Sequence, residues 1–147
     1  MYGKTAPKAY HANQVSTVSK QKLIILMYDG AIRFITQAKE MTKRGDIAGR
    51  GHYIGKAQKI VDELNGALDS KRGGEVASSL SQVYIEIRKL LTDANISGKI
   101  ASMDSALEML TDIRSAWEQV ISASGGAEER AAPDVRKDNG NRLTISC

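Results

Sequence analysis

Cysteine, proline and aromatic residues are scarce in this chain of 147 residues, and each scarcity excludes a class of structure. The only cysteine is Cys147, so a disulfide within the chain and a CxxC metal or redox site are impossible. Only two prolines and one phenylalanine occur, whereas Leu, Ile, Ala, Lys, Glu and Gln are plentiful, which favours helices over sheets. We expect one helical domain with a single core, in a reducing compartment.

Long apolar runs are also absent. The longest, Leu23 to Tyr28, is far too short to cross a bilayer, and residues 1–22 lack the apolar core of a secretory signal. We therefore expect a cytoplasmic protein without membrane insertion.

The net charge of +4 is concentrated at one end of the chain. Residues 1–22 carry four lysines and no acid, whereas residues 23–122 carry 13 basic and 13 acidic side chains. A nucleic-acid-binding domain usually has a basic face with interleaved aromatic residues. Because the body of this chain is neutral, we expect no nucleic-acid partner.

Catalytic and metal-binding patterns are missing from the sequence. The two histidines, His11 and His52, have no metal-ligand spacing. The glycines and lysine between Gly49 and Lys56 lack the Walker spacing and the Ser/Thr that follows it. We expect no enzymatic activity, no metal and no cofactor.

Apolar residues that recur every three or four positions predict an all-α protein. The expected helices cover residues 19–44, 50–69, 75–96 and 100–123, and Leu68–Glu75 is expected to form a turn. Short connections between them indicate an antiparallel up-and-down four-helix bundle over residues 19–123. Residues 1–18 are expected to form an extended arm and residues 124–147 a flexible tail.

The first helix has more apolar residues than one core-facing side requires. The core-facing stripe is expected to hold Leu23, Ile24, Met27, Ala31, Phe34, Ile35, Ala38 and Met41. Ile25, Tyr28 and Ile32 then form a second seam, and Ile85 and Ile96 point away from the core of the third helix. We interpret the seam as a hydrophobic groove for a partner helix or extended peptide. The alternative is scattered exposed apolar residues, which are normal.

Several motifs resemble those of the FliS family of flagellin export chaperones. YDGAIRF, within LIILMYDGAIRFITQA at Leu23–Ala38, is similar to the family's first-helix signature. The other matching motifs are AYHANQV at Ala9–Val15, IGKAQKIVDELNGALD at Ile54–Asp69, GGEVASSL at Gly73–Leu80, DAN at Asp93–Asn95 and IRSAW at Ile113–Trp117. The chain departs from the family pattern at Lys20 and Gln21, where the family often has proline and an acid, and its tail matches no family motif.

The resemblance implies a cytosolic bundle that binds the disordered C-terminal segment of flagellin, prevents premature polymerisation and delivers it to the flagellar type III export gate. It is also compatible with weak self-association of the free protein. The alternative is a helical adaptor or regulatory bundle that binds another amphipathic partner through the same groove.

The resemblance also suggests which residues bind. The predicted groove holds Ile24, Ile25, Tyr28, Ile32, Lys56, Ala57, Gln58, Ile60 and Ile85. Among these, Ala57 is expected at a close approach, and Lys56 and Gln58 at the polar rim. Tyr10 and Val15 of the basic arm are predicted to cover the groove as a lid until cargo displaces them; otherwise the arm stays disordered.

Overall fold

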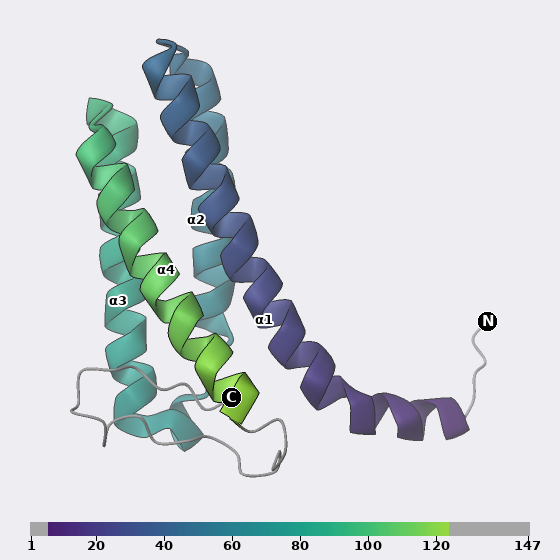
Figure 1. Ribbon diagram of the computed structural model, residues 1–147. Helices are drawn as coiled ribbons and strands as arrows, with labels where there is room; N and C mark the ends of the chain where they lie inside the picture. Colours follow the sequence, from purple (N-terminus) through teal and green to yellow (C-terminus); the bar gives the residue numbers. More distant parts are fainter. Residues whose placement is uncertain (1–5, 124–147) are drawn as a thin grey trace.

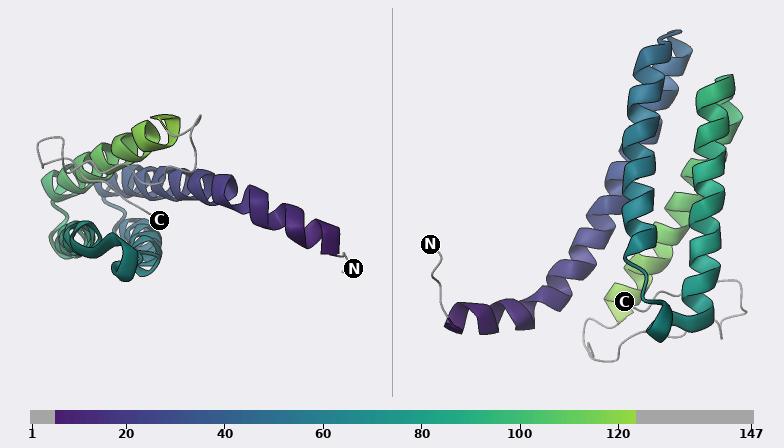
Figure 2. Two further views of the ribbon diagram at one scale, coloured as in Figure 1. Left: turned by 90° about the horizontal axis from the view of Figure 1, so that it is seen from below. Right: turned by 180° about the vertical axis from the view of Figure 1, so that it is seen from behind.

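The computed structural model describes the backbone of residues 6–123 and the side chains of residues 19–69 and 73–123. Its helices are α1 (Ala6–Lys43), α2 (Ile47–Gly66), α3 (Ser70–Ser97) and α4 (Ile100–Ala123). The substantial contacts are α1–α2, α2–α3, α3–α4 and α1–α4, so each helix packs on two others. Seen from one end, α1 and α4 form one layer and α2 and α3 the other (Figure 2). The predicted all-α four-helix bundle is confirmed.

The core between the two layers is apolar except for a few aromatic hydroxyl and indole groups. Its buried members are Tyr28, Ala31, Ile35, Ala38, Ile54, Ala57, Val61, Leu64, Leu80, Tyr84, Ile87, Leu91, Ala94, Met103, Ala106, Leu110, Ile113 and Trp117. On each helix these residues recur at intervals of three or four, as the sequence pattern predicted. Burial of this stripe is the main favourable contribution to folding.

The helix α1 begins at Ala6, far earlier than the expected start near Ser19. The prediction of an extended backbone for residues 6–18 is therefore wrong. Figures 1 and 2 show the N-terminal part of α1 projecting away from the other three helices. Periodicity did not predict this segment, because residues 6–18 have no apolar repeat at helical spacing. The predicted flexible tail at residues 124–147 lies outside the described residues.

Two other helix starts also differ from expectation. The helix α2 starts at Ile47 instead of Arg50, because the carboxylate of Asp46 caps it by accepting a hydrogen bond of 2.9 Å from the backbone N–H of Gly49. The helix α3 starts inside the segment expected to be a turn and has non-helical torsions at Gly74, with φ 52° and ψ −124°. The glycine therefore bends α3 near its start (Figure 1).

Candidate binding surfaces

One side of α1 is fixed against α4 by an ion pair. Arg114 on α4 donates from Nε to Oδ1 of Asp29 over 2.6 Å. The hydrogen bond that Arg114 donates to Asp29 raises the pKa of Arg114 above its ordinary value, although burial opposes this rise. Ile25 and Ile32 lie four residues before and three after Asp29, so they share the α4 side of α1. Both are half-buried against the core and are not freely exposed.

Tyr28 differs from its predicted position in an exposed seam. Its side chain is fully buried, so the predicted exposure is wrong. The hydroxyl of Tyr28 forms a hydrogen bond with the hydroxyl of Tyr84, and Nε1 of Trp117 donates to the Tyr28 oxygen over 3.2 Å. Tyr28 therefore joins α1 to α3 and α4 inside the core. A ligand on the surface cannot touch it in this arrangement.

The other side of α1 approaches α2 closely at Gly30. A Cβ placed on Gly30 would lie only 3.2 Å from Cδ1 of Ile60, so the absence of a side chain allows this contact. Leu23 and Leu26 lie seven and four residues before Gly30 and so share this side. They are 54% and 62% exposed. We call Leu23, Leu26 and Ile60 the leucine patch. The prediction that Leu23 lies in the core is wrong, and Leu26 is a candidate that the sequence reading missed.

Farther along the same α1–α2 side, aromatic and cationic groups meet. The rings of Phe34 and Tyr53 stack with centroids 6.1 Å apart and planes inclined by 22°. The guanidinium of Arg33 and the ammonium of Lys56 each lie 5.4 Å from the centroid of the Phe34 ring. Two cations thus face one aromatic ring, an arrangement that cation–π attraction stabilises. Lys56 is exposed, and its place at the polar rim of a groove stays a prediction.

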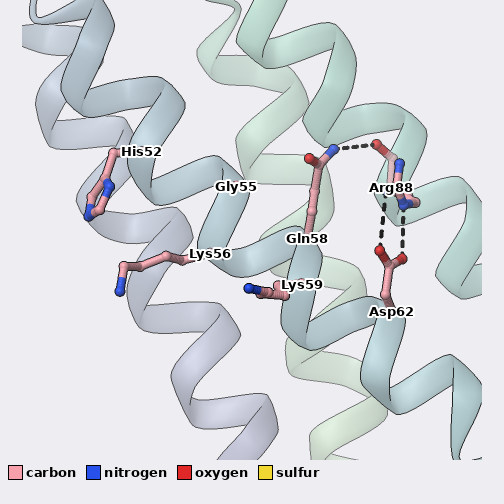
Figure 3. Close-up of a pocket in the computed structure, with 7 residues that line it drawn as sticks. All are labelled: His52, Gly55, Lys56, Gln58, Lys59, Asp62 and Arg88. Carbon is pink, nitrogen blue, oxygen red and sulfur yellow. Dashed lines mark hydrogen bonds and ion pairs between the residues drawn. The ribbon is translucent and has the colours of Figure 1, made fainter.

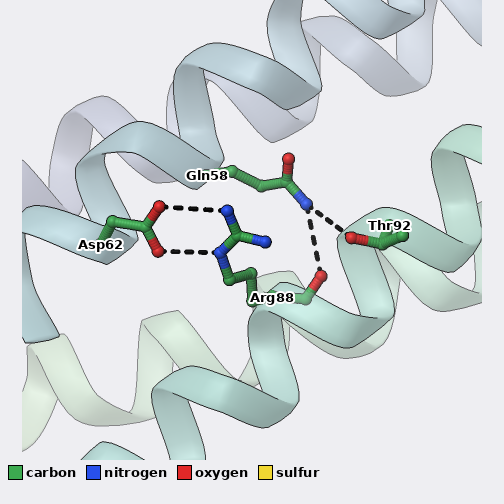
Figure 4. Close-up of polar contacts among 4 residues, drawn as sticks. All are labelled: Gln58, Asp62, Arg88 and Thr92. Carbon is green, nitrogen blue, oxygen red and sulfur yellow. Dashed lines mark hydrogen bonds and ion pairs between the residues drawn. The ribbon is translucent and has the colours of Figure 1, made fainter.

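Between α2 and α3, polar side chains bridge the two helices (Figure 4). Gln58 donates from Nε2 to Oγ1 of Thr92 over 2.9 Å and to the backbone oxygen of Arg88 over 3.3 Å. Arg88 pairs with Asp62 through bonds of 2.8 and 3.2 Å. The hydrogen bond that Arg88 donates to Asp62 and the charge of Asp62 raise the pKa of Arg88 above its ordinary value. Gln58 is therefore a link between helices as well as a predicted rim residue.

A hollow of about 330 Å³ lies over α2 beside this bridge. Figure 3 shows His52 and Lys56 on the α1 side of α2, with Gln58 and Asp62 directed toward Arg88 on α3. The lining of this hollow therefore runs across the outer side of α2, from the α1–α2 side at Lys56 to the α2–α3 side at Arg88. Ile85, 47% exposed on α3, belongs to that second side.

The remaining predicted groove residues divide between the core and its margin. Ala57 is fully buried, while Ile24 and Ile60 are half-buried against the core. The predicted groove residues therefore do not form one contiguous surface. The side chains of the predicted lid residues, Tyr10 and Val15, lie outside the described side chains.

The described part of the chain holds neither a cluster of metal-ligating side chains nor a membrane-spanning helix. Among these residues, no three His, Cys, Asp or Glu side chains gather as a metal site would require. The described helices include none with the length and apolar character needed to cross a bilayer.

Comparison with known proteins places this bundle in a family. The sequence model described as "Flagellar protein FliS" matches residues 3–124. The flagellar secretion chaperone FliS of Salmonella typhimurium is 30% identical over 135 residues, covering 88% of this chain and all of the relative. FliSB of Pseudomonas aeruginosa is 34% identical over 82% of this chain and 98% of its own length. FliS of Campylobacter jejuni is 33% identical over 82% of this chain and 94% of its own length. The chain belongs to the FliS family of flagellar secretion chaperones.

Proposed function

We propose that this chain binds the C-terminal segment of flagellin in the cytoplasm, prevents its premature polymerisation and delivers it to the flagellar type III export apparatus. Membership of the FliS family supports the proposal at the level of the chaperone class. The structural observation that carries it is the leucine patch, where Leu23 and Leu26 expose most of their side chains in the middle of a long helix. Apolar side chains held on a rigid helix are suited to an amphipathic segment.

The leucine patch alone is too small for stable binding. Burying three or four Leu- or Ile-sized side chains contributes roughly 5–10 kcal/mol. Association and the ordering of a disordered segment cost about as much. The cargo must therefore make a longer contact. Half-buried Ile25 and Ile32 on the α4 side and exposed Lys56 beside α2 are the proposed extensions of the groove.

The test is calorimetric titration of the full chain with a peptide from the C terminus of flagellin of the same organism. Leu26→Asp should weaken binding at least tenfold, about 1.4 kcal/mol, because the carboxylate is hydrated in the free protein and loses water in the complex. Its melting temperature should stay that of the parent chain. Ile47→Asp is the matched control, since Ile47 is 67% exposed at the start of α2, at the opposite end of the α1–α2 pair.

Two other outcomes of this titration would contradict the proposed role of the leucine patch. Absence of binding by the unmodified chain would favour the alternative, an adaptor bundle with a different amphipathic partner. Normal binding by the Leu26→Asp variant would move the groove to the α4 side of α1, where Ile25→Asp and Ile32→Asp test it in the same way.

A further inference from the structure

Two cations from neighbouring helices meet at one aromatic ring on the α1–α2 side. The guanidinium of Arg33 on α1 and the ammonium of Lys56 on α2 each lie 5.4 Å from the centroid of the Phe34 ring. The two charges are therefore no farther apart than the sum of these distances. Both cationic side chains are exposed, whereas the stacked rings of Phe34 and Tyr53 are half-buried. We call Arg33, Phe34, Tyr53 and Lys56 the cationic cluster.

Neither cation of the cluster has an acidic partner. Among the side chains that the structure describes, Arg33 and Lys56 form no ion pair. Asp29, one turn before Arg33, is already paired with Arg114 on α4. On α2, no acid lies within one turn of Lys56 in either direction. The two like charges repel each other, and the attraction of each to the ring offsets only part of this repulsion. An anion that contacts both would remove it.

Two exposed acids limit the size of that anion. Glu40 follows Arg33 by seven residues on α1, and Glu63 follows Lys56 by seven residues on α2, so each lies two turns, or about 10 Å, along its helix. Because α1 and α2 run in opposite directions (Figure 1), the two acids stand at opposite ends of the cluster. Charges at such a separation are largely screened at physiological salt, where the screening length is about 8 Å. The cluster therefore attracts one carboxylate, whereas a chain of phosphates would extend onto the acids.

The cluster is continuous with the leucine patch. Arg33 follows Gly30 by three residues, and Lys56 precedes Ile60 by four, so both cations lie one turn from the close contact of Gly30 with Ile60. Leu26 lies one turn from the same contact in the other direction along α1. A segment that covers the leucine patch and continues along the α1–α2 side therefore reaches both cations within two turns. This continuity identifies the occupant as the same segment.

We propose that the cationic cluster binds one Asp or Glu carboxylate of the flagellin segment. This inference rests on the proposed function and adds the chemical group that the cluster recognises. The planar guanidinium of Arg33 donates hydrogen bonds to the carboxylate, and the ammonium of Lys56 donates to it from the neighbouring helix. Charge pairs at the edge of an apolar contact fix its register. A segment that slid by one turn, or lay in the reverse direction, would move its carboxylate away from both cations. The cluster therefore sets the position of the cargo.

The test titrates the full chain with the flagellin C-terminal peptide and with a set of peptides in which each acid in turn becomes its amide. One substitution, Asp to Asn or Glu to Gln, should weaken binding about three- to tenfold, and the others less than about twofold. The variant with Arg33→Gln and Lys56→Gln should bind the unmodified peptide about three- to tenfold more weakly. It should also be insensitive to the one effective amide substitution, because the two ends of one interaction are removed together. The differences should shrink in 0.5 M NaCl.

Matched variants separate the cluster from the general charge of the protein. Lys59→Gln removes an exposed lysine one turn after Lys56 and one turn before Glu63, and Lys43→Gln removes one at the end of α1. Both should keep the affinity within about twofold. Lys56→Glu should weaken the unmodified peptide further, and a peptide with lysine at the sensitive acid should regain affinity for this variant. Helicity and melting of every variant should match the parent chain, because these are surface positions.

Four results would overturn the proposal, and they distinguish it from the proposed function. A peptide that binds and tolerates every amide substitution would leave flagellin binding in place and remove the carboxylate contact. An amide substitution that weakens the double variant as much as the parent chain would place the carboxylate on other residues. Displacement of the peptide by a single-stranded oligonucleotide would make phosphate the ligand. Absence of binding by every peptide would overturn flagellin binding and the carboxylate contact together.

Discussion

The hydroxyl of Tyr28 is shared by three helices, so its removal should affect stability more than its size suggests. Tyr28→Phe deletes the acceptor for Nε1 of Trp117 and the partner of the Tyr84 hydroxyl, all inside the core. Loss of a partner for buried polar groups costs about 1–3 kcal/mol. We expect a decrease of that order in the free energy of unfolding, measured by urea denaturation with unchanged m-value.

A double-mutant cycle checks the origin of this effect. Tyr84→Phe combined with Tyr28→Phe should cost less than the sum of the single changes, because both ends of one hydrogen bond are removed together. Tyr53→Phe is the control: the Tyr53 ring is half-buried, and the structure describes no hydrogen bond of its hydroxyl. Its effect should stay within about 0.5 kcal/mol. Additive costs for the first pair would contradict coupling through the hydroxyls.

Single residues of the core were largely predictable, and the exceptions have physical reasons. Ile35 and Leu110 repeat at helical intervals toward the core and are buried, as expected. Tyr28 lies at the edge of that stripe on a helical wheel, but its hydroxyl has partners on α3 and α4 that only the tertiary structure reveals. Leu23 fits the stripe by spacing and is nevertheless exposed, because α1 leaves the bundle in this region (Figure 1).

At the scale of elements, Gly74 controls the bend near the start of α3. Its φ of 52° with ψ −124° is a combination that residues with a Cβ rarely adopt. Gly74→Ala should therefore lower the free energy of unfolding by about 1–3 kcal/mol. Urea denaturation checks the magnitude.

The matched change is Gly55→Ala, in the interior of α2. A Cβ there would meet no atom within 4 Å, and the backbone is helical. Alanine at this position should raise stability by about 0.5–1 kcal/mol. If both alanine variants shifted stability in the same direction, the bend at Gly74 would not depend on its backbone torsions.

Helix boundaries were predictable where the chain has a strong signal. The span of α4, Ile100–Ala123, agrees with the expected 100–123, since its apolar repeat runs to both ends. The start of α2 was misjudged because the cap at Asp46 precedes the first apolar repeat. The start of α1 was misjudged because its first turns carry no apolar period to reveal a helix. Helix propensity alone, without an apolar repeat, is a weak signal. Tertiary contacts then decide whether such a segment is helical.

Surfaces belong to the scale of the whole molecule, and the sequence predicted them least well. It indicated that α1 and α3 carry surplus apolar residues. Ile85 and Ile96 on α3 are exposed as expected, whereas on α1 the exposed residue is Leu26, which the sequence reading missed. It did not separate the leucine patch from the α2–α3 side, because that division depends on which helix sides meet. The contact of Gly30 with Ile60 and the pairing of Asp62 with Arg88 establish it.

The projecting part of α1 bears on the predicted lid. For this segment to cover the leucine patch, α1 would have to unwind between the lid and Leu23. Residues 15–19, VSTVS, consist of Val, Ser and Thr, which have low helix propensity, so unwinding there would cost little. The lid residues Tyr10 and Val15 would then return over exposed Leu23 and Leu26. This mechanism stays a prediction, and it can be tested with the full chain.

Stabilising the helix at residues 15–19 should keep the lid residues away from the leucine patch. Ser16→Ala with Thr17→Ala raises the helix propensity of the stretch that must unwind, so we expect more bound apolar dye and faster amide exchange around Ile25 and Ile32. If half the molecules are closed, opening all of them raises dye binding about twofold, and deletion of residues 1–14 should do the same. The control, Ser78→Ala with Ser79→Ala on exposed positions of α3, should change neither. Equal dye binding in all four proteins would mean that the arm never covers the patch, whereas a rise on deletion alone would mean that it closes without unwinding.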